Sequence, residues 1–532
     1  MLANRGILTP DDAAAFCYPS LEKLHDPFLM DDMDRAVQRL TQAVERKEKI
    51  LVFGDYDVDG ITAAALMVRE LDALQCPTYY YIPNRLLEGY GLNKERVEKA
   101  HQEGIGLIIT VDNGVSSHEE IKLAATYGID VIVCDHHEPE GQLPPALAVL
   151  NPKRKDSRYP FRELSGVGVA FKLATALLGR LPRSLDLTAL GTIADIVPLI
   201  DENRVLASAG LKMMNEKDGL SVGLSELCRV SGLDGRAINS GNIAFQLAPR
   251  LNAAGRLGVA QLGVQLLLTT SQQLAQRIAR KLDEENRNRQ EIEDEILTQA
   301  LAKLEEEFDP QRHFSIVLHD TRWHPGVIGI VASKLVELYH RPTILIALGE
   351  HTGKGSARSI HNFHIYEALC KCQQHLVGFG GHRYAAGLTV ETTRLDEWCA
   401  AFEQVCRERL CEDDLRPVSR ADAVLEFSHI DAALIQWIDK LGPFGNANPV
   451  PVFASFNVSA AGAVRVLRGN HLKFALRQGR RMLPAIGFRM AEHEHLVTEG
   501  NPLDVLYTPQ LNTYRGVTTM QLSLREIRPH YR

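Results

Sequence analysis

The stretch that most constrains the fold runs from Lys49 to Gly60 and reads KILVFGDYDVDG. Its first part, Ile50 to Phe53, is short, β-rich and free of polar residues, which is typical of a parallel strand buried on both faces. Three carboxylates follow with no Lys or Arg among them, so water or cations must relieve their repulsion. A helical pattern comes next, which predicts that the acids lie where open α/β sheets bind ligands. An Asp-rich surface turn is the alternative for this segment alone.

The same arrangement returns further along the chain. Gly106 to Gly114 (GLIITVDNG) is an apolar strand that ends in Asp112, and Asp130 to His137 (DVIVCDHH) ends in an acid and two histidines. Successive βα units place the carboxyl ends of their strands at one edge of a parallel sheet. The repeated pattern therefore predicts an α/β fold with a metal site at that edge.

A fourth acid lies in an apolar, helical segment, Leu185 to Leu199 (LDLTALGTIADIVPL). A buried carboxylate such as Asp195 must be paired, protonated or bound to a metal. Capping of a neighbouring helix or pairing with an arginine is the alternative to metal binding.

Three further segments combine small residues with groups that bind phosphate. SGNIAFQLAPRLNAAGRLG (residues 240–258) contains two arginines, which pair either with phosphates or with acids of the fold. GKGSARS (353–359) and GFGGHRYAAG (378–387) are predicted to be glycine-rich loops that cradle phosphate, with tight hairpins as the alternative. The candidate nucleic-acid-binding residues are Arg250, Asn252, Arg256, Gly381, His382 and Arg383.

Length and charge set the domain organisation. A chain of 532 residues is too long for one compact core. Residues 451–532 hold 11 Lys and Arg against 5 Asp and Glu, a balance of +6 within a chain of net charge −8. Such a basic end indicates a polyanion contact. We expect a helical arm (1–45), a parallel-sheet catalytic domain (46–270), a long connector helix (271–308), a second α/β domain (309–415) and a β-barrel of OB type that binds nucleic acid (416–532).

The nine cysteines lack the spacing of a zinc site or a redox motif and are expected to be reduced. No apolar run approaches the length of a membrane span, and the N-terminal residues show no apolar signal core. We expect a monomer with no membrane contact, in the cytoplasm or at the nucleoid.

Four motifs carry a family resemblance: DYDVDG, VDNG, DHH and the acid of GTIADIVPL resemble the motifs of the DHH phosphoesterase superfamily, in the same order. PRLNAAGR, WHPGVIGIVASKL, GSARS, GFGGHRYAAG and LGPFGNANPVPVF resemble its RecJ exonuclease branch. The resemblance implies a single-stranded-DNA-specific 5′→3′ exonuclease that uses Mn²⁺ or Mg²⁺ in recombination and repair. A RecQ-type helicase and a single-stranded-DNA-binding protein are its implied partners.

The resemblance also implies roles for individual residues. One departure from the superfamily pattern is Phe53, which stands where some members have a histidine and cannot bind metal. The implied metal ligands are Asp57, Asp59, Asp112, His136 and Asp195, with Asp112 as the bridge between two ions, Asp55 as a helper and His137 at the scissile phosphate. Arg85, Ser356 and Arg358 are expected to bind a terminal 5′-phosphate, since guanidinium groups match phosphate oxygens.

The expected mechanism is hydrolysis with two cations about 3.5–4 Å apart, one generating the attacking hydroxide and the other stabilising the leaving oxygen. Two other functions remain open on the residues. One is a phosphodiesterase of short oligonucleotides or cyclic dinucleotides, and the other is a non-catalytic DNA-binding replisome scaffold, which would have lost the acids.

Overall fold

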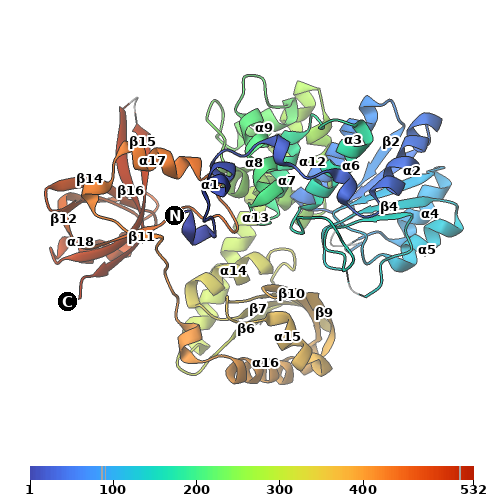
Figure 1. Ribbon diagram of the computed structural model, residues 1–532. Coiled ribbons are helices and arrows are strands. Elements are labelled where there is room, and N and C mark those ends of the chain that lie inside the picture. The colour runs from blue at the N-terminus through green and yellow to red at the C-terminus, as the bar shows by residue number, and fades with distance from the viewer. Residues whose placement is uncertain (85–87, 90, 140, 515–516, 532) are drawn as a thin grey trace.

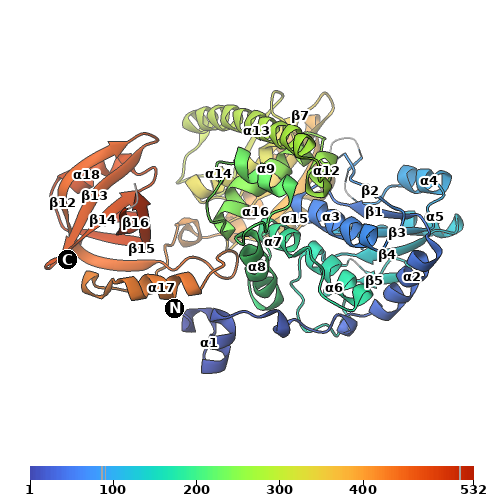
Figure 2. The same ribbon diagram turned by 90° about the horizontal axis from the view of Figure 1, so that it is seen from above.

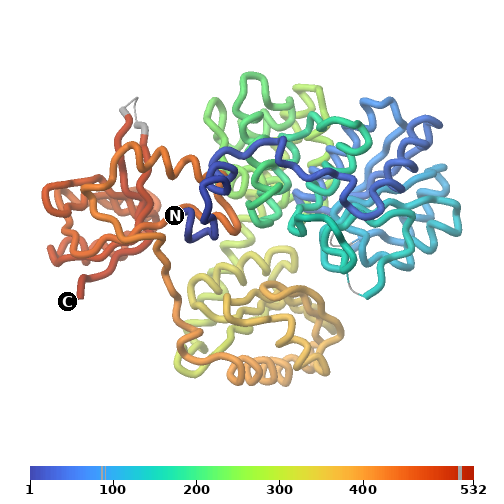
Figure 3. The backbone as a smooth tube through the Cα atoms, in the orientation of Figure 1, coloured from blue at the N-terminus to red at the C-terminus, as the bar shows by residue number. Residues whose placement is uncertain are grey.

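The structure is a computed structural model that describes residues 1–84, 88–89, 91–139, 141–514 and 517–531. Figure 1 shows three parts built on β-sheets: one coloured blue to green, one yellow to brown, and one orange to red at the C-terminal end. A single extended stretch of chain leads from the second part to the third, as the tube in Figure 3 makes clear. The expected α/β fold with a C-terminal barrel is confirmed.

The first sheet is parallel throughout, in the order β2-β1-β3-β4-β5. Every residue of β1 and β3 is buried, as their unbroken apolar sequences predict. The strand order reverses between β1 and β3, and such a switch point opens a crevice at the carboxyl ends of the two strands. The bounds are β1 Ile50–Gly54, β2 Thr78–Tyr81, β3 Leu107–Val111, β4 Asp130–Cys134 and β5 Ala148–Leu150.

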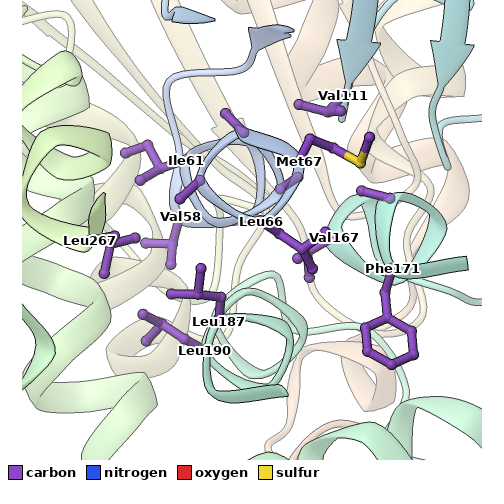
Figure 4. Packing of buried hydrophobic residues seen from close by; sticks show 14 of the residues in the cluster. Val58, Ile61, Leu66, Met67, Val111, Val167, Phe171, Leu187, Leu190 and Leu267 are labelled. Carbon is purple, nitrogen blue, oxygen red and sulfur yellow. The ribbon is translucent and has the colours of Figure 1, made fainter. Parts of the chain in front are cut away.

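Helices cover both faces of this sheet (Figures 1 and 2). Alternate side chains of β1 enter the two hydrophobic clusters: Ile50 and Val52 pack with α2, α3, α6 and α7, whereas Leu51 and Phe53 pack with α4 and α5. Figure 4 shows Val58, Ile61, Leu66 and Met67 of α3 against Val167 and Phe171 of α6 and Leu187 and Leu190 of α7. The bounds are α1 Pro10–Cys17, α2 Met33–Arg46, α3 Val58–Ala73, α4 Lys94–Gln102, α5 His118–Thr126, α6 Gly166–Leu178 and α7 Leu185–Ala194.

A helical region follows and ends in the predicted connector. The connector helix α13 has 36 residues and is about 54 Å long. Its first half buries Ala275 and Leu282 in the core of the first part, and its second half buries Ile296 and Leu304 in the core of the second. The bounds are α8 Asp201–Met214, α9 Val222–Val230, α10 Ser240–Asn242, the π-helical turn Ile243–Leu247, α11 Ala248–Arg256, α12 Gln261–Leu268 and α13 Gln272–Glu307.

The second sheet has the order β6-β7-β8-β10-β9, parallel between β6 and β7 and antiparallel elsewhere. The prediction of two glycine-rich loops is wrong, because most of GKGSARS forms β8, whereas GFGGHRYAAG forms the tight hairpin of β9 and β10 that was its alternative. Gly355 suits a central strand here, since a Cβ on it would lie 2.8 Å from Leu388 Cδ1. The bounds are β6 Ile316–Asp320, α14 Ile328–Tyr339, β7 Thr343–Leu348, β8 Thr352–Arg358, α15 Ile365–Lys371, β9 Leu376–Gly381, β10 Ala385–Glu391 and α16 Leu395–Arg409.

The C-terminal strands close into a barrel, because β12 pairs with both β13 and β15 and the remaining pairs complete the circuit. The loop of residues 441–448 contacts the first part, where Arg204 of α8 donates a hydrogen bond to the carbonyl of Gly442 at 2.6 Å. The bounds are β11 Ala423–Val424, α17 Ala432–Lys440, β12 Phe453–Leu467, β13 His471–Gln478, β14 Arg481–Gly487, α18 Glu494–Thr498, β15 Leu503–Tyr514 and β16 Val517–Pro529.

Within the described part of the chain, no helix combines the length and the apolar character that a membrane crossing requires.

Candidate metal centre

The loop after β1 turns directly into α3 and brings its acids together at the switch point. Asp57 caps α3, since its carboxylate accepts hydrogen bonds from the backbone N–H groups of Asp59 and Gly60 at 2.9 and 3.2 Å. Gly60 allows the turn, because a Cβ there would lie 2.5 Å from the backbone nitrogen of Asp55. The helix thus begins one residue before Asp59 and presents that side chain from its first turn.

Asp59 lies at the N-terminus of a second helix, α6. Its two carboxylate oxygens accept hydrogen bonds from the N–H groups of Gly166 and Val167 at 2.5 and 2.9 Å. Burial raises the pKa of Asp59 to about 7, with a further contribution from Asp57, although the two hydrogen bonds oppose the shift. A cation near this carboxylate would remove the cost of keeping it ionised.

Asp112 follows β3 and has a left-handed backbone, with φ 63°. The N-terminus of α6 packs directly on its side chain, since a Cβ on Gly166 would lie 2.7 Å from Asp112 Cβ. Burial raises the pKa of Asp112 well above its usual value, and repulsion from the carboxylates of Asp59 and Asp57 adds to this. The fold therefore holds this acid in a site that favours its neutral form unless positive charge is supplied.

His136 and Asp195 complete the cluster. The Nε2 atom of His136 lies 3.1 Å from Asp112 Oδ1 and 3.6 Å from Asp195 Oδ2. Burial lowers the pKa of His136 to about 3, so the ring is neutral at physiological pH. Among the described residues, neither His136 Nε2 nor Asp195 Oδ2 has a hydrogen-bond partner. A divalent cation could bind both atoms, because the lone pairs of the nitrogen and the carboxylate oxygen face one another in a buried site.

Three overlapping groups have ligand atoms within 4.8 Å of one another. Asp112 and His136 each belong to two of them; of the two, only the carboxylate has two oxygens with which to bind two ions, which suits the expected role of Asp112 as a bridge. Phe53 takes no part, because its ring is fully buried on the other side of the sheet and stacks on Tyr81 at 5.8 Å between centroids. The groups are Asp55, Asp57 and Asp112; Asp59, His136 and Asp195; and Asp112, His136 and His137.

Asp135 is a residue to which the sequence analysis assigned no role. Its Oδ1 lies 2.7 Å from His137 Nδ1 and accepts hydrogen bonds from the N–H groups of His136 and His137 at 2.8 and 3.1 Å. Burial opposes the charged form of both partners, yet their attraction lowers the pKa of Asp135 to about 2 and raises that of His137. Asp135 therefore orients His137 and favours its protonated form, rather than binding a metal ion. One signal in the sequence pointed to a role of Asp135 in the site, because this acid comes directly after the apolar run that forms β4.

We expect Asp135→Asn to lower kcat about 10- to 100-fold, the usual cost of losing a group that orients a site residue. The amide would no longer stabilise charge on His137, so the alkaline limb of the pH–rate profile, where His137 loses its proton, should move to lower pH while the affinity for Mn²⁺ changes little. Asp130→Asn, at the opposite end of β4, is the matched control. A loss of Mn²⁺ affinity as large as the loss of kcat would contradict this role.

The segment after α7 differs from the prediction of one helix through Asp195. The helix ends at Ala194, because Pro198 disfavours helical backbone just before it, and Asp195 is its C-cap. Ile196 then has φ 62°, an unusual conformation for a β-branched residue. The side-chain amide of Asn446, in the 441–448 loop, donates to the carbonyl of Ile196 at 2.7 Å, and Leu199 N–H donates to the carbonyl of Asn446. A residue 250 positions away thus holds the turn that carries Asp195.

The acid cluster predicts how stability depends on pH and metal. The folded-state pKa of Asp59 is raised to about 7, and the pKa values of Asp112 and Asp195 are raised well above the ordinary 3.8, so these groups stabilise the protonated fold at low pH. That stability is lost as pH rises through the folded values. We expect the melting temperature of metal-free protein to fall between about pH 5 and pH 8, and Mn²⁺ to raise it most at pH 8. Differential scanning calorimetry of Asp112→Asn should show a shallower fall; an equal slope would contradict the assignment.

A second group of candidate residues surrounds the N-terminus of α14. Arg358 donates a hydrogen bond to Ser356 Oγ at 3.1 Å, and a Cβ on Gly329 would lie 2.6 Å from that same oxygen and 2.8 Å from Arg358 Nη2. A hydroxyl, a guanidinium and a helix N-terminus thus converge, a combination that suits phosphate. Arg85, the third residue expected here, lies outside the described residues.

Helix α11 connects this group to the metal centre. Asn252 accepts a hydrogen bond from Val58 N–H at 3.2 Å, next to the acids, and Arg256 donates to the carbonyl of Gly326 at 2.9 Å, just before α14. Arg250 forms an ion pair with Asp283 of the connector at 2.9 Å. Two of the three candidates on this helix therefore contact the metal loop or the second part of the chain.

The other three candidates lie at the turn between β9 and β10. Gly381 has φ 145°, where a side chain would be strained, and the N–H of His382 donates to the carbonyl of Ala385 at 2.8 Å. Arg383 is exposed and lies over the ring of Tyr384, 5.6 Å from its centroid. The turn thus presents a cation and an aromatic ring at the surface.

The class of protein follows from three family models. "DHH family, N-terminal domain" matches residues 49–192, "DHHA1 domain" matches residues 312–408, and "RecJ OB domain" matches residues 421–526. The first match spans the ends of β1, β3 and β4 and all the acids of the metal centre except Asp195. The fold and the site thus define a protein of the DHH class.

Relatives along the whole chain specify the family. The single-stranded-DNA-specific exonuclease RecJ of Bacillus subtilis is 38% identical over 99% of this chain and 67% of its own length. RecJ of Escherichia coli is 35% identical over 94% of this chain and 91% of its own. The crystal structure of RecJ from Thermus thermophilus in complex with Mn²⁺ matches with a TM-score of 0.84 and 31% identity, over 100% of this chain and 75% of that one. The chain belongs to the RecJ family.

Proposed function

We propose that this chain is a metal-dependent exonuclease that degrades single-stranded DNA from its 5′ end to mononucleotides, with Mn²⁺ or Mg²⁺ as cofactor, in recombination and repair. The observation that carries the proposal is that one helix, α11, contacts both groups. Asn252 contacts the metal loop and Arg256 reaches the start of α14, four residues or about 6 Å further along the helix axis. For a strand that lies along α11, that rise is comparable with the separation of successive phosphates, so one nucleotide would lie between a bound 5′-phosphate and the cations.

The acids of the first part would hold the cations. Asp112 would contact both, with Asp57 and Asp55 on one side and Asp59, His136 and Asp195 on the other. Divalent cations, when bound, activate water and neutralise the charge that builds up on a phosphodiester. His137, whose protonated form Asp135 favours, would donate to an oxygen of the scissile phosphate, which is where a raised pKa is useful.

Ser356 and Arg358 would bind the terminal phosphate together with the N-terminus of α14. A guanidinium pairs with two phosphate oxygens at once, and the helix N-terminus favours negative charge. We assign substrate binding to residues 309–415 on this basis, catalysis to 46–270, and a contact with the downstream strand to the basic barrel of 416–532. Arg85 keeps its expected role in the same pocket.

The test uses purified protein, Mn²⁺ and single-stranded DNAs labelled at either end, with and without a 5′-phosphate, beside an Asp112→Ala control. Release of mononucleotides from the 5′ end, absent in the variant, is the expected result. Survival of long strands while dinucleotides are consumed would instead indicate a phosphodiesterase of short oligonucleotides. Binding without cleavage would indicate a scaffold, although the assembled acids favour catalysis.

An enzyme restricted to single strands needs proteins that supply them. We therefore propose a RecQ-type helicase, which separates the strands, and a single-stranded-DNA-binding protein, which keeps them apart, as partners at the nucleoid in the cytoplasm. Coupled unwinding and degradation of a blunt duplex, seen only when both enzymes are present, would support this.

A further inference from the structure

Phe245 is the most exposed large apolar side chain among the described residues, with 82% of its surface open to solvent. It lies in the π-helical turn Ile243–Leu247, where Ala248 N–H bonds back to the carbonyl of Ile243. Pro249 has no N–H with which to continue the ordinary helical pattern, which accounts for the wider turn. Such turns recur at functional sites.

The position of Phe245 on its helix links it to the metal centre. Phe245 precedes Asn252 by seven residues and Arg256 by eleven, at the N-terminal end of the helical segment that carries both. Asn252 contacts the metal loop, and Arg256 contacts the segment before α14. The neighbouring Gly255 also faces that loop, since a Cβ on it would lie 2.3 Å from the carbonyl oxygen of Tyr56. Phe245 therefore lies beyond Asn252 on the side away from the phosphate pocket.

Distances along the helix relate the ring to a strand that follows α11 from the terminal phosphate past the cations. Phe245 precedes Asn252 by seven residues, a rise of about 10 Å. For such a strand this corresponds to about two nucleotides beyond the scissile phosphate. The polar neighbours are already engaged, because Gln246 pairs with Asn242 and Arg250 pairs with Asp283. The ring is thus the group on this stretch that remains available to a ligand.

We propose that Phe245 is a stacking platform for a nucleobase of the strand that is being degraded, close to the third nucleotide from its 5′ end. The inference rests on the proposed function. A phenyl ring offers no hydrogen bonds, so it would stack on every base and give no sequence preference. Its role would be to hold the remaining strand in register after each mononucleotide leaves.

The kinetic test compares Phe245→Ala with Phe245→Trp, and uses Phe28→Ala, another exposed phenylalanine far along the chain, as the matched control. On a 5′-phosphorylated strand of about twenty nucleotides, loss of one stacked base should raise KM roughly 5- to 150-fold and leave kcat nearly unchanged. Tryptophan should restore KM, and a dinucleotide, which does not reach the ring, should be cleaved equally by all variants. An unchanged KM on the long strand, or an equal loss on the dinucleotide, would overturn the inference.

A binding test separates this inference from the proposed function, because it needs no cleavage. In the Asp112→Asn background, 2-aminopurine placed at successive positions of the strand should show a fluorescence change on binding that is largest near the third nucleotide. Phe245→Ala should abolish that change at this position only. If the fluorescence depends on Phe245 but no strand is ever cut, the platform stands and the exonuclease proposal fails. If strands are cut but no position depends on Phe245, the platform fails alone.

Discussion

Asp112→Asn is expected to reduce exonuclease activity by about three orders of magnitude or more. This carboxylate lies within ligand distance of two groups of metal-type side chains and is the only residue that we assign to both cations. An amide keeps the shape but contributes no negative charge, so affinity for the second cation should fall with the rate. Activity against Mn²⁺ concentration, together with calorimetric Mn²⁺ binding, measures both effects.

The same variant should be more stable than the wild type when no metal is present. Burial and the neighbouring carboxylates penalise ionised Asp112 in the fold, and asparagine removes that penalty. Asp72→Asn, near the far end of α3 and about 20 Å along the helix from Asp59, is the control for the chemical change alone. Near-normal activity of Asp112→Asn, or an equal loss of activity in Asp72→Asn, would show that Asp112 is not the ligand shared by the two cations.

Arg358→Ala should raise KM for 5′-phosphorylated strands about 10- to 100-fold, the range expected for losing hydrogen bonds to a charged group. The guanidinium lies against Ser356 and the start of α14, so its loss removes a cation of the proposed pocket. Strands with a 5′-hydroxyl lack the ligand and should be degraded with nearly unchanged KM. The preference for a 5′-phosphate should thus disappear.

Two companion variants sharpen this test. Arg358→Lys keeps the charge but loses the two-pronged geometry, and should recover only part of the affinity. Arg312→Ala removes an arginine whose side chain is 81% exposed in the same part of the chain, and should behave like the wild type. A KM increase that is equal for phosphorylated and unphosphorylated strands would mean that Arg358 stabilises the fold and does not read the end.

Local patterns along the chain predicted much of the fold and of the metal centre. Unbroken apolar runs such as Ile50 to Phe53 predict buried parallel strands because both faces of each strand need apolar side chains. An acid directly after such a strand is predicted to lie at the carboxyl edge of the sheet. The connector helix was also predictable within one residue at each end, since its sequence has no Gly or Pro and Ser271 caps it.

Tertiary contacts decided the rest. GKGSARS looks like a loop by composition, yet it forms a central strand because its glycines fit beneath Leu388 and Ile346 of the neighbouring strands. Asp135 resembles the metal-binding acids in sequence, but its hydrogen bonds commit it to His137. In both cases the outcome depends on contacts with other parts of the fold, which the composition of the segment does not show.

By itself, the sequence determined which side chains reach the carboxyl edge of the first sheet, because strand direction and the placement after each strand are local properties. Only the tertiary structure decided how they act. Asp59 faces the N-terminus of α6, more than a hundred residues away, and the turn after Asp195 is held by Asn446 from the entry to the barrel. The physical reason is that ionisation, orientation and metal affinity depend on distances of a few ångströms between residues far apart in sequence, and only the packed fold sets those distances.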